Sequence, residues 1–144
     1  MAVVINGSSG ITTNDGSAFT DSSGNSGIGL SNPAVKLDVD GQISGKFSAV
    51  GTNTAAQALG TNHVSEVIIS ANTTLTTTVP PAGSQAIVII VSSGATSRTV
   101  TFGTGFAATA TLATGATTNR RFVVSFVSDG TRLLECSRTT AITV

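Results

Sequence analysis

The chain has 144 residues, a length that fits one domain or one small domain preceded by an arm. Only 10% of its residues are charged and the formal net charge is zero, so neither a nucleic-acid partner nor an anionic membrane is indicated. The longest unbroken apolar run, residues 86–91, is far shorter than the about 20 residues that a membrane-spanning helix needs. The N-terminus has no signal-peptide pattern, so we expect synthesis in a cytoplasm without an export signal.

Residues 1–62 have the composition of an extended arm. They hold ten of the sixteen glycines, and glycine-rich polar sequence loses much entropy on folding while it buries little. Apolar residues nevertheless recur, and we expect them to anchor the arm on another surface: Val3, Val4, Ile5, Phe19, Ile28 and Leu30. The alternative is a disordered tail.

Two short elements are expected within the arm. The alternation of VKLDVDG, residues 35–41, predicts a short half-buried strand with Leu37 and Val39 on one face. Asp38 and Asp40 suggest calcium, but the other ligands of an EF-hand loop are missing, so a solvated strand face is favoured. NTAAQALG, residues 53–60, predicts at most one short helix, stable only if several copies pack with Leu59 inside.

Residues 63–144 read as a β-rich head domain. Short, threonine-rich strands at spacings near 8–12 residues predict a mostly β fold, an antiparallel β-sandwich or jelly-roll-like head. Asp129-Gly130 is the clearest hairpin signal. Two segments, residues 86–91 and 120–127, are apolar on both faces; a sandwich core covers one face, and we expect other copies of the chain to cover the other, with Val123 and Val127 in that interface.

The chain carries no recognisable catalytic or ligand-binding pattern. His63 is the only histidine; a Ser-His-Asp arrangement stays open, but without a G-x-S-x-G elbow an ordinary polar histidine is favoured. Cys136 is the only cysteine; nearby arginines could lower the pKa of its thiol, but we expect a small apolar core residue. One histidine and one cysteine cannot build a zinc site in one chain. We therefore expect no enzyme, no metal and no cofactor.

One segment resembles a known class of proteins. GNSGIGLSNPAVKLDVDGQISG, residues 24–45, resembles a segment common in fibre-like virion proteins of tailed bacteriophages, which reads roughly G-N-V-G-I-G-T-x-x-P-x-x-K-L-D-V-x-G. The matching residues are Gly24, Asn25, Gly27, Ile28, Gly29, Pro33, Lys36, Leu37, Asp38, Val39 and Gly41, whereas Ser26 and Leu30 depart from the usual residues. Together with the first twenty residues, the resemblance covers about 40 residues.

The resemblance implies a homotrimer in which the N-terminal arm docks on the virion and a β-rich knob projects. The arm's anchors would then bind the major capsid protein or another virion protein, and Leu37 and Val39 would belong to a trimer-forming strand. The implied function is a capsid decoration or cement protein, assembled in the host cytoplasm, that stabilises neighbouring capsomers. A tail fibre or receptor-binding protein is the alternative, which the small size and the shortage of aromatic residues disfavour.

Overall fold

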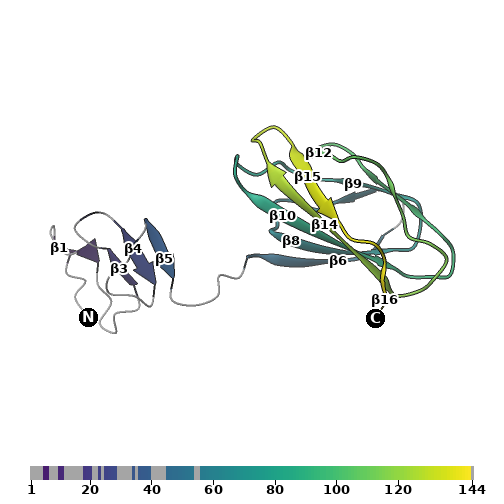
Figure 1. The fold of residues 1–144 in the computed structure, drawn as a ribbon, viewed down its shortest axis with the longest axis horizontal. Helices are drawn as coiled ribbons and strands as arrows, with labels where there is room; N and C mark the ends of the chain where they lie inside the picture. The colour runs from purple at the N-terminus through teal and green to yellow at the C-terminus, as the bar shows by residue number, and fades with distance from the viewer. Residues whose placement is uncertain are drawn as a thin grey trace. The chain divides into compact units, whose positions relative to one another are not determined.

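A computed structural model describes residues 5–6, 10–11, 18–20, 23, 25–28, 34, 36–39, 45–53 and 56–143. The chain divides into two compact units, Met1–Ser44 and Gly45–Val144 (Figure 1). Every regular element among the described residues is a strand, which confirms the expected mostly β fold.

The described residues of the first unit form five short strands. Strand β1 (Ile5–Asn6) pairs antiparallel with β2 (Gly10–Ile11). A three-stranded sheet has the order β3 (Ala18–Thr20), β4 (Ser26–Ile28) and β5 (Leu37–Val39), with β3 antiparallel and β5 parallel to β4. Strand β5 confirms the strand that the alternation of residues 35–41 predicts.

The second unit is a sandwich-like pair of sheets. The larger sheet has the order β12 (Phe106–Ala107), β15 (Leu133–Arg138), β14 (Arg120–Ser128), β10 (Gln85–Ser92), β8 (Val64–Ile69) and β6 (Phe47–Asn53), and β16 (Ile142–Thr143) also pairs with β14 (Figure 1). The smaller sheet has the order β13 (Leu112–Ala113), β11 (Thr99–Phe102), β9 (Thr73–Thr76) and β7 (Ala56–Ala58).

The chain alternates between these two sheets from β6 to β11. Strands β6, β8 and β10 lie side by side in the larger sheet, whereas β7, β9 and β11 lie side by side in the smaller one. Between two neighbouring strands of one sheet, the chain passes through one strand of the other sheet and returns. The neighbours therefore run in the same direction and pair in parallel, as β6 does with β8 and β7 with β9. The expectation of an antiparallel head is wrong for this part of the fold, because both sheets are mixed. Antiparallel pairing in this unit begins with β13, which returns beside β11, and continues with β14, which returns beside β10.

Strands β14 and β15 form the expected hairpin. The carboxylate oxygen Oδ1 of Asp129 accepts hydrogen bonds from the backbone nitrogens of Thr131 and Arg132, each at 2.7 Å. Gly130 has a φ of 91°, a left-handed conformation that glycine adopts without steric cost. The Asp-Gly pair thus acts as the sequence predicts, with the aspartate side chain closing the turn.

The hydrophobic core lies between the two sheets and draws on both. Phe126 is 2% exposed, and its ring lies 5.0 Å from that of Phe106 and 5.5 Å from that of Phe102, measured between centroids. The other buried members are Leu59, Val67, Ile69, Leu75, Ala86, Val88, Ile90, Val100, Leu112, Phe122, Val124 and Leu133. A single chain therefore buries the inner faces of both sheets without help from another copy.

The boundary between the units differs from the one expected at residue 62. It follows Ser44, because β6 pairs with β8 and β7 pairs with β9, which makes residues 45–62 part of the head. The short helix expected over residues 53–60 is wrong, since Ala56–Ala58 form strand β7. Leu59 is 4% exposed in the core of its own chain, which leaves almost none of its side chain for another copy, contrary to expectation.

Candidate interaction surface

The two outward faces of the sandwich-like unit differ in chemistry. The outward residues of the smaller sheet are mainly threonines with alanines between them: Thr74, Thr76, Thr99, Thr101, Ala56, Ala58 and Ala113. Threonine favours strands and is polar, so this composition suits a sheet face that meets water. This threonine face provides an internal reference for a solvated surface in the same molecule.

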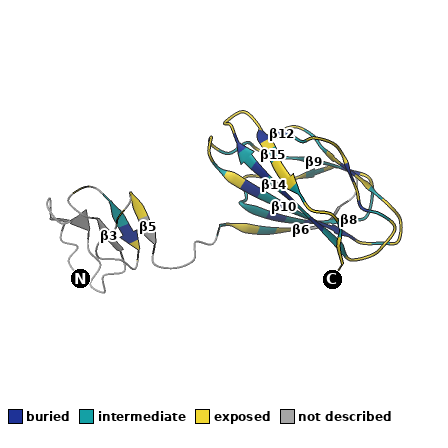
Figure 2. Cartoon of the chain, in the orientation of Figure 1, coloured by how far each residue is buried: buried dark blue, intermediate teal, exposed yellow. Residues whose placement is uncertain are grey.

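The outward face of the larger sheet is apolar instead, and we call it the apolar face. On β8, β10 and β14 the outward side chains are half-buried, apart from the exposed Gln85 and the buried Val91. Two large apolar side chains at the margins are more exposed, Phe47 at 55% and Leu134 at 38%. Figure 2 shows exposed stretches on β6 and β15. The apolar outward residues are Phe47, Val64, Ile68, Ile87, Ile89, Val123, Val127, Leu134 and Ile142. Large apolar patches on soluble proteins mark interaction sites.

Strand register makes the apolar face continuous. Phe47 is the register partner of Val64, Val64 of Ile87, and Ile87 of Ser125, so three neighbouring strands present apolar side chains in one row. One step along β10, Ile89 lies opposite Val123 on β14. The expectation that Val123 lies on an outer, apolar face is therefore consistent with its position, and Val127 occupies the same face four residues further along β14.

One ion pair crosses the apolar face. Nη1 of Arg121 on β14 lies 2.9 Å from Oε2 of Glu66 on β8, so the pair spans the intervening strand β10. The Glu66 side chain is 23% exposed and that of Arg121 is 43% exposed. Because the two charges neutralise each other, the pair adds no net charge to the face.

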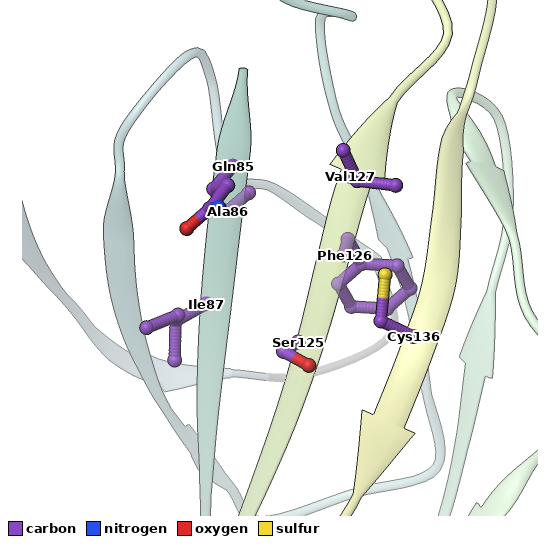
Figure 3. Close-up of a pocket in the computed structure, with 7 residues that line it drawn as sticks. All are labelled: Gln85, Ala86, Ile87, Ser125, Phe126, Val127 and Cys136. Carbon is purple, nitrogen blue, oxygen red and sulfur yellow. The ribbon is translucent and has the colours of Figure 1, made fainter. Parts of the chain in front are cut away.

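A hollow of about 190 Å³ opens at the β10–β14–β15 side of the apolar face (Figure 3). Its lining residues are Gln85, Ala86, Ile87, Ser125, Phe126, Val127 and Cys136. Ala86 and Phe126 belong to the buried core, whereas Gln85, Ile87, Ser125 and Val127 alternate with them on the outward side. None of the lining side chains is charged, so the hollow suits an apolar occupant.

Cys136 lies in this hollow because of a β-bulge. The register of β14 and β15 pairs Ser125 with Ser137 and Phe126 with Glu135, which leaves Cys136 as the extra residue between them. The expectation of a buried core cysteine is wrong, since Cys136 is exposed. A bulge cannot be predicted from the alternation of residues 133–138, because it breaks that alternation.

The residues predicted to dock on a partner surface fall in the first unit. Val3, Val4 and Leu30 lie outside the described residues. Ile5 lies in β1, Phe19 in β3 and Ile28 in β4, where Ile28 is 51% exposed.

Both residues predicted for a trimer-forming strand lie in β5. Leu37 is 58% exposed, and Val39 is two residues further along the same strand. Within the three-stranded sheet, β5 is therefore an outer strand that presents a large apolar side chain.

His63, the histidine considered above for a catalytic role, packs against Gly45. A Cβ atom built on Gly45 would lie 1.7 Å from Nδ1 of His63, so the imidazole packs directly against the glycine backbone. Within the part of the chain that the structure describes, no three acidic, histidine or cysteine side chains are grouped to hold a metal ion. No helix among the same residues is long and apolar enough to cross a membrane.

Comparison of the chain with protein-family models, with curated proteins and with solved structures found no match.

Proposed function

We propose that this protein is a structural component of a bacteriophage virion, a capsid decoration or cement protein that docks on the shell as a trimer. The observation that carries the proposal is that the resembling segment and the hydrophobic core lie in different units of the chain. The segment that resembles fibre-like virion proteins, residues 24–45, falls almost entirely in Met1–Ser44, whereas the hydrophobic core belongs to Gly45–Val144. A separate N-terminal unit for attachment and a self-sufficient β head suit a protein that decorates a larger particle.

The first unit supplies attachment in this proposal. Ile28 and Leu37 expose about half of their side chains, and the proposal assigns both to the attachment surface, although the resemblance implies a trimer-forming strand for Leu37. Burying each against the major capsid protein or another virion protein would contribute about 1.5–3 kcal/mol. In a trimer, the first docked unit holds the other two at high effective concentration, so three weak contacts give firm attachment. A ligand that binds only the assembled shell stabilises that shell by mass action.

Binding to particles that lack the protein tests the proposal. Ile28→Glu and Leu37→Glu should weaken binding at least about tenfold, because each places a charge where an apolar side chain is buried. Thr101→Glu, on the threonine face of the second unit, is the matched control and should bind like the original protein. Binding that is unchanged by both first-unit variants would move the attachment site elsewhere and contradict the proposal.

Copy number separates decoration from the tail-fibre alternative. A decoration protein occupies repeated sites on the shell, so quantitative mass spectrometry of purified particles should find it in numbers comparable to those of the capsomers. A few trimers per particle would instead place the protein in the tail.

A further inference from the structure

The apolar face carries a projecting side chain at one side. Phe47 is the first residue of β6, the outermost strand of the larger sheet among the described strands, and it is 55% exposed. It lies at the end of the apolar row that runs through Val64 and Ile87. A phenylalanine exposed to this extent at the end of an apolar row can bury a large area against a partner.

The same face carries a hollow of about 190 Å³ at the other side, lined by Ile87, Ser125, Val127 and Cys136 among others (Figure 3). Phe47 and Ser125 belong to one register row, three strand spacings apart, which is about 14 Å at the usual spacing of 4.8 Å. Phe47 therefore does not fill the hollow of its own chain, and the face presents a projection at one side and a recess at the other.

We propose that Phe47 of one copy inserts into the hollow of the next copy, so that the apolar faces form the interface of the oligomer. This inference rests on the self-association in the proposed function, and it identifies the surface that performs it. A contact between two different patches is heterologous, and a heterologous contact closes into a ring when the rotation between copies allows it. A trimer is such a ring.

The chemistry of the two patches favours a second copy as the partner. Neither Phe47 nor the hollow carries a charge, and the nearby charges of Glu66 and Arg121 already neutralise each other. Since one face carries both the exposed Phe47 and the hollow, a second copy of the chain supplies the complement of each patch. Inside the hollow, the Cys136 sulfur offers a polarisable partner to an aromatic ring, a contact that stabilises such packing.

Two independent measurements test the contact. Phe47→Ala should weaken oligomerisation at least about tenfold in sedimentation equilibrium, because an aromatic side chain in a pocket typically dominates an interface. The control is Thr101→Ala on the threonine face, which should assemble like the original protein. When Phe47→Ala and the original protein are compared at equal fractions of monomer, their unfolding temperatures should agree, since the Phe47 side chain is largely outside the core.

The second measurement uses the original sequence and its single cysteine. Alkylation of Cys136 by a maleimide should be slow in the oligomer and about tenfold or more faster in Phe47→Ala, whose hollow is empty. A monomeric original protein at micromolar concentration would overturn both this contact and the proposed trimer. An intact oligomer in which Phe47→Ala assembles normally and Cys136 reacts freely would overturn the contact alone and leave the proposed function standing.

Discussion

Arg138 holds both carboxylate oxygens of Glu135, with its Nη2 lying 2.6 Å from Oε2 and its Nε bonded to Oε1. The same guanidinium donates to the carbonyl oxygens of Ala110 at 2.9 Å and Thr111 at 3.1 Å. The backbone nitrogen of Thr109 donates to Oε2 of Glu135 at 2.9 Å. This pair therefore connects the segment between β12 and β13 to strand β15.

The pair predicts a specific loss of stability in acid. The hydrogen bonds from Arg138 lower the pKa of Glu135 to about 2, against the opposing effect of burial, from an ordinary value of 4.5. Because the folded-state pKa is the lower one, the carboxylate stabilises the fold fully above about pH 4.5, and this contribution is lost as the pH falls toward 2.

The free energy of unfolding of Glu135→Gln should therefore be about 1–3 kcal/mol lower than that of the original protein at pH 7. The difference in the free energy of unfolding should shrink as the pH is lowered from about 4.5 and nearly vanish by about pH 2. Urea titrations across this range measure it. A difference that is independent of pH would show that the variant loses packing and not a charge interaction.

The contact between Gly45 and His63 predicts that one substitution reduces the cost of the other. A Cβ at residue 45 would meet Nδ1 of His63 at 1.7 Å and its Cβ at 2.6 Å, so Gly45→Ala must displace the imidazole. We expect Gly45→Ala to cost about 1–3 kcal/mol, the usual range for overpacking. In a His63→Ala background the obstructing ring is gone, and the cost should fall below about 1 kcal/mol. Thermal unfolding of the four proteins in a double-mutant cycle measures the coupling, and purely additive effects would contradict it.

Replacement by alanine should destabilise the head strongly at one glycine and hardly at all at another. Gly105 has a φ of 90°, and a Cβ there would lie 2.4 Å from the carbonyl oxygen of Thr77. Gly105→Ala should cost at least about 2 kcal/mol, because strain in the left-handed region adds to a clash with backbone. Gly94 has no atom within 4 Å of such a Cβ, so Gly94→Ala should lie within about 0.5 kcal/mol of the original protein. Equal costs at both positions would exclude this steric explanation.

The strands of the head could be predicted from local chemistry, whereas which strands pair with each other, and in which direction, could not. β-Branched runs identify β10 and β14, and Asp129-Gly130 identifies the hairpin that follows, because propensity and turn geometry act over a few residues. The parallel pairs arise because the chain changes sheet at every step from β6 to β11, and strand spacing does not distinguish that path from an antiparallel one. At Ala56–Ala58 local helix propensity yields to pairing with β9 and to the burial of Leu59.

The candidate surface was predictable only in its centre. Val123 and Val127 alternate with the core residues of β14, so a second apolar face follows from period two. Phe47 is not predicted to lie in this surface, because the glycines on either side, at residues 45 and 51, favour an arm over a strand. The hollow depends on the bulge at Cys136, and only the observed register reveals it.

The unit boundary leads to a prediction about two truncations. Removing residues 1–44 leaves Gly45–Val144 with both sheets and the whole core, so this fragment should fold alone and unfold cooperatively. Removing residues 1–62 deletes β6 and β7 and takes Leu59, which is 4% exposed, out of the core.

The longer truncation should be strongly destabilised. It uncovers the edges of β8 and β9 and loses a buried leucine, a loss that by itself costs about 2–5 kcal/mol when leucine is replaced by alanine. Circular dichroism with thermal melting should show a sharp transition for residues 45–144 and a low or absent one for residues 63–144. Leu59→Ala in the full chain is the matched control and should lower the stability by the leucine's share alone. If residues 63–144 melted as cooperatively and at the same temperature as residues 45–144, then β6 and β7 would not be part of the folded head, and the boundary would lie near residue 62 after all.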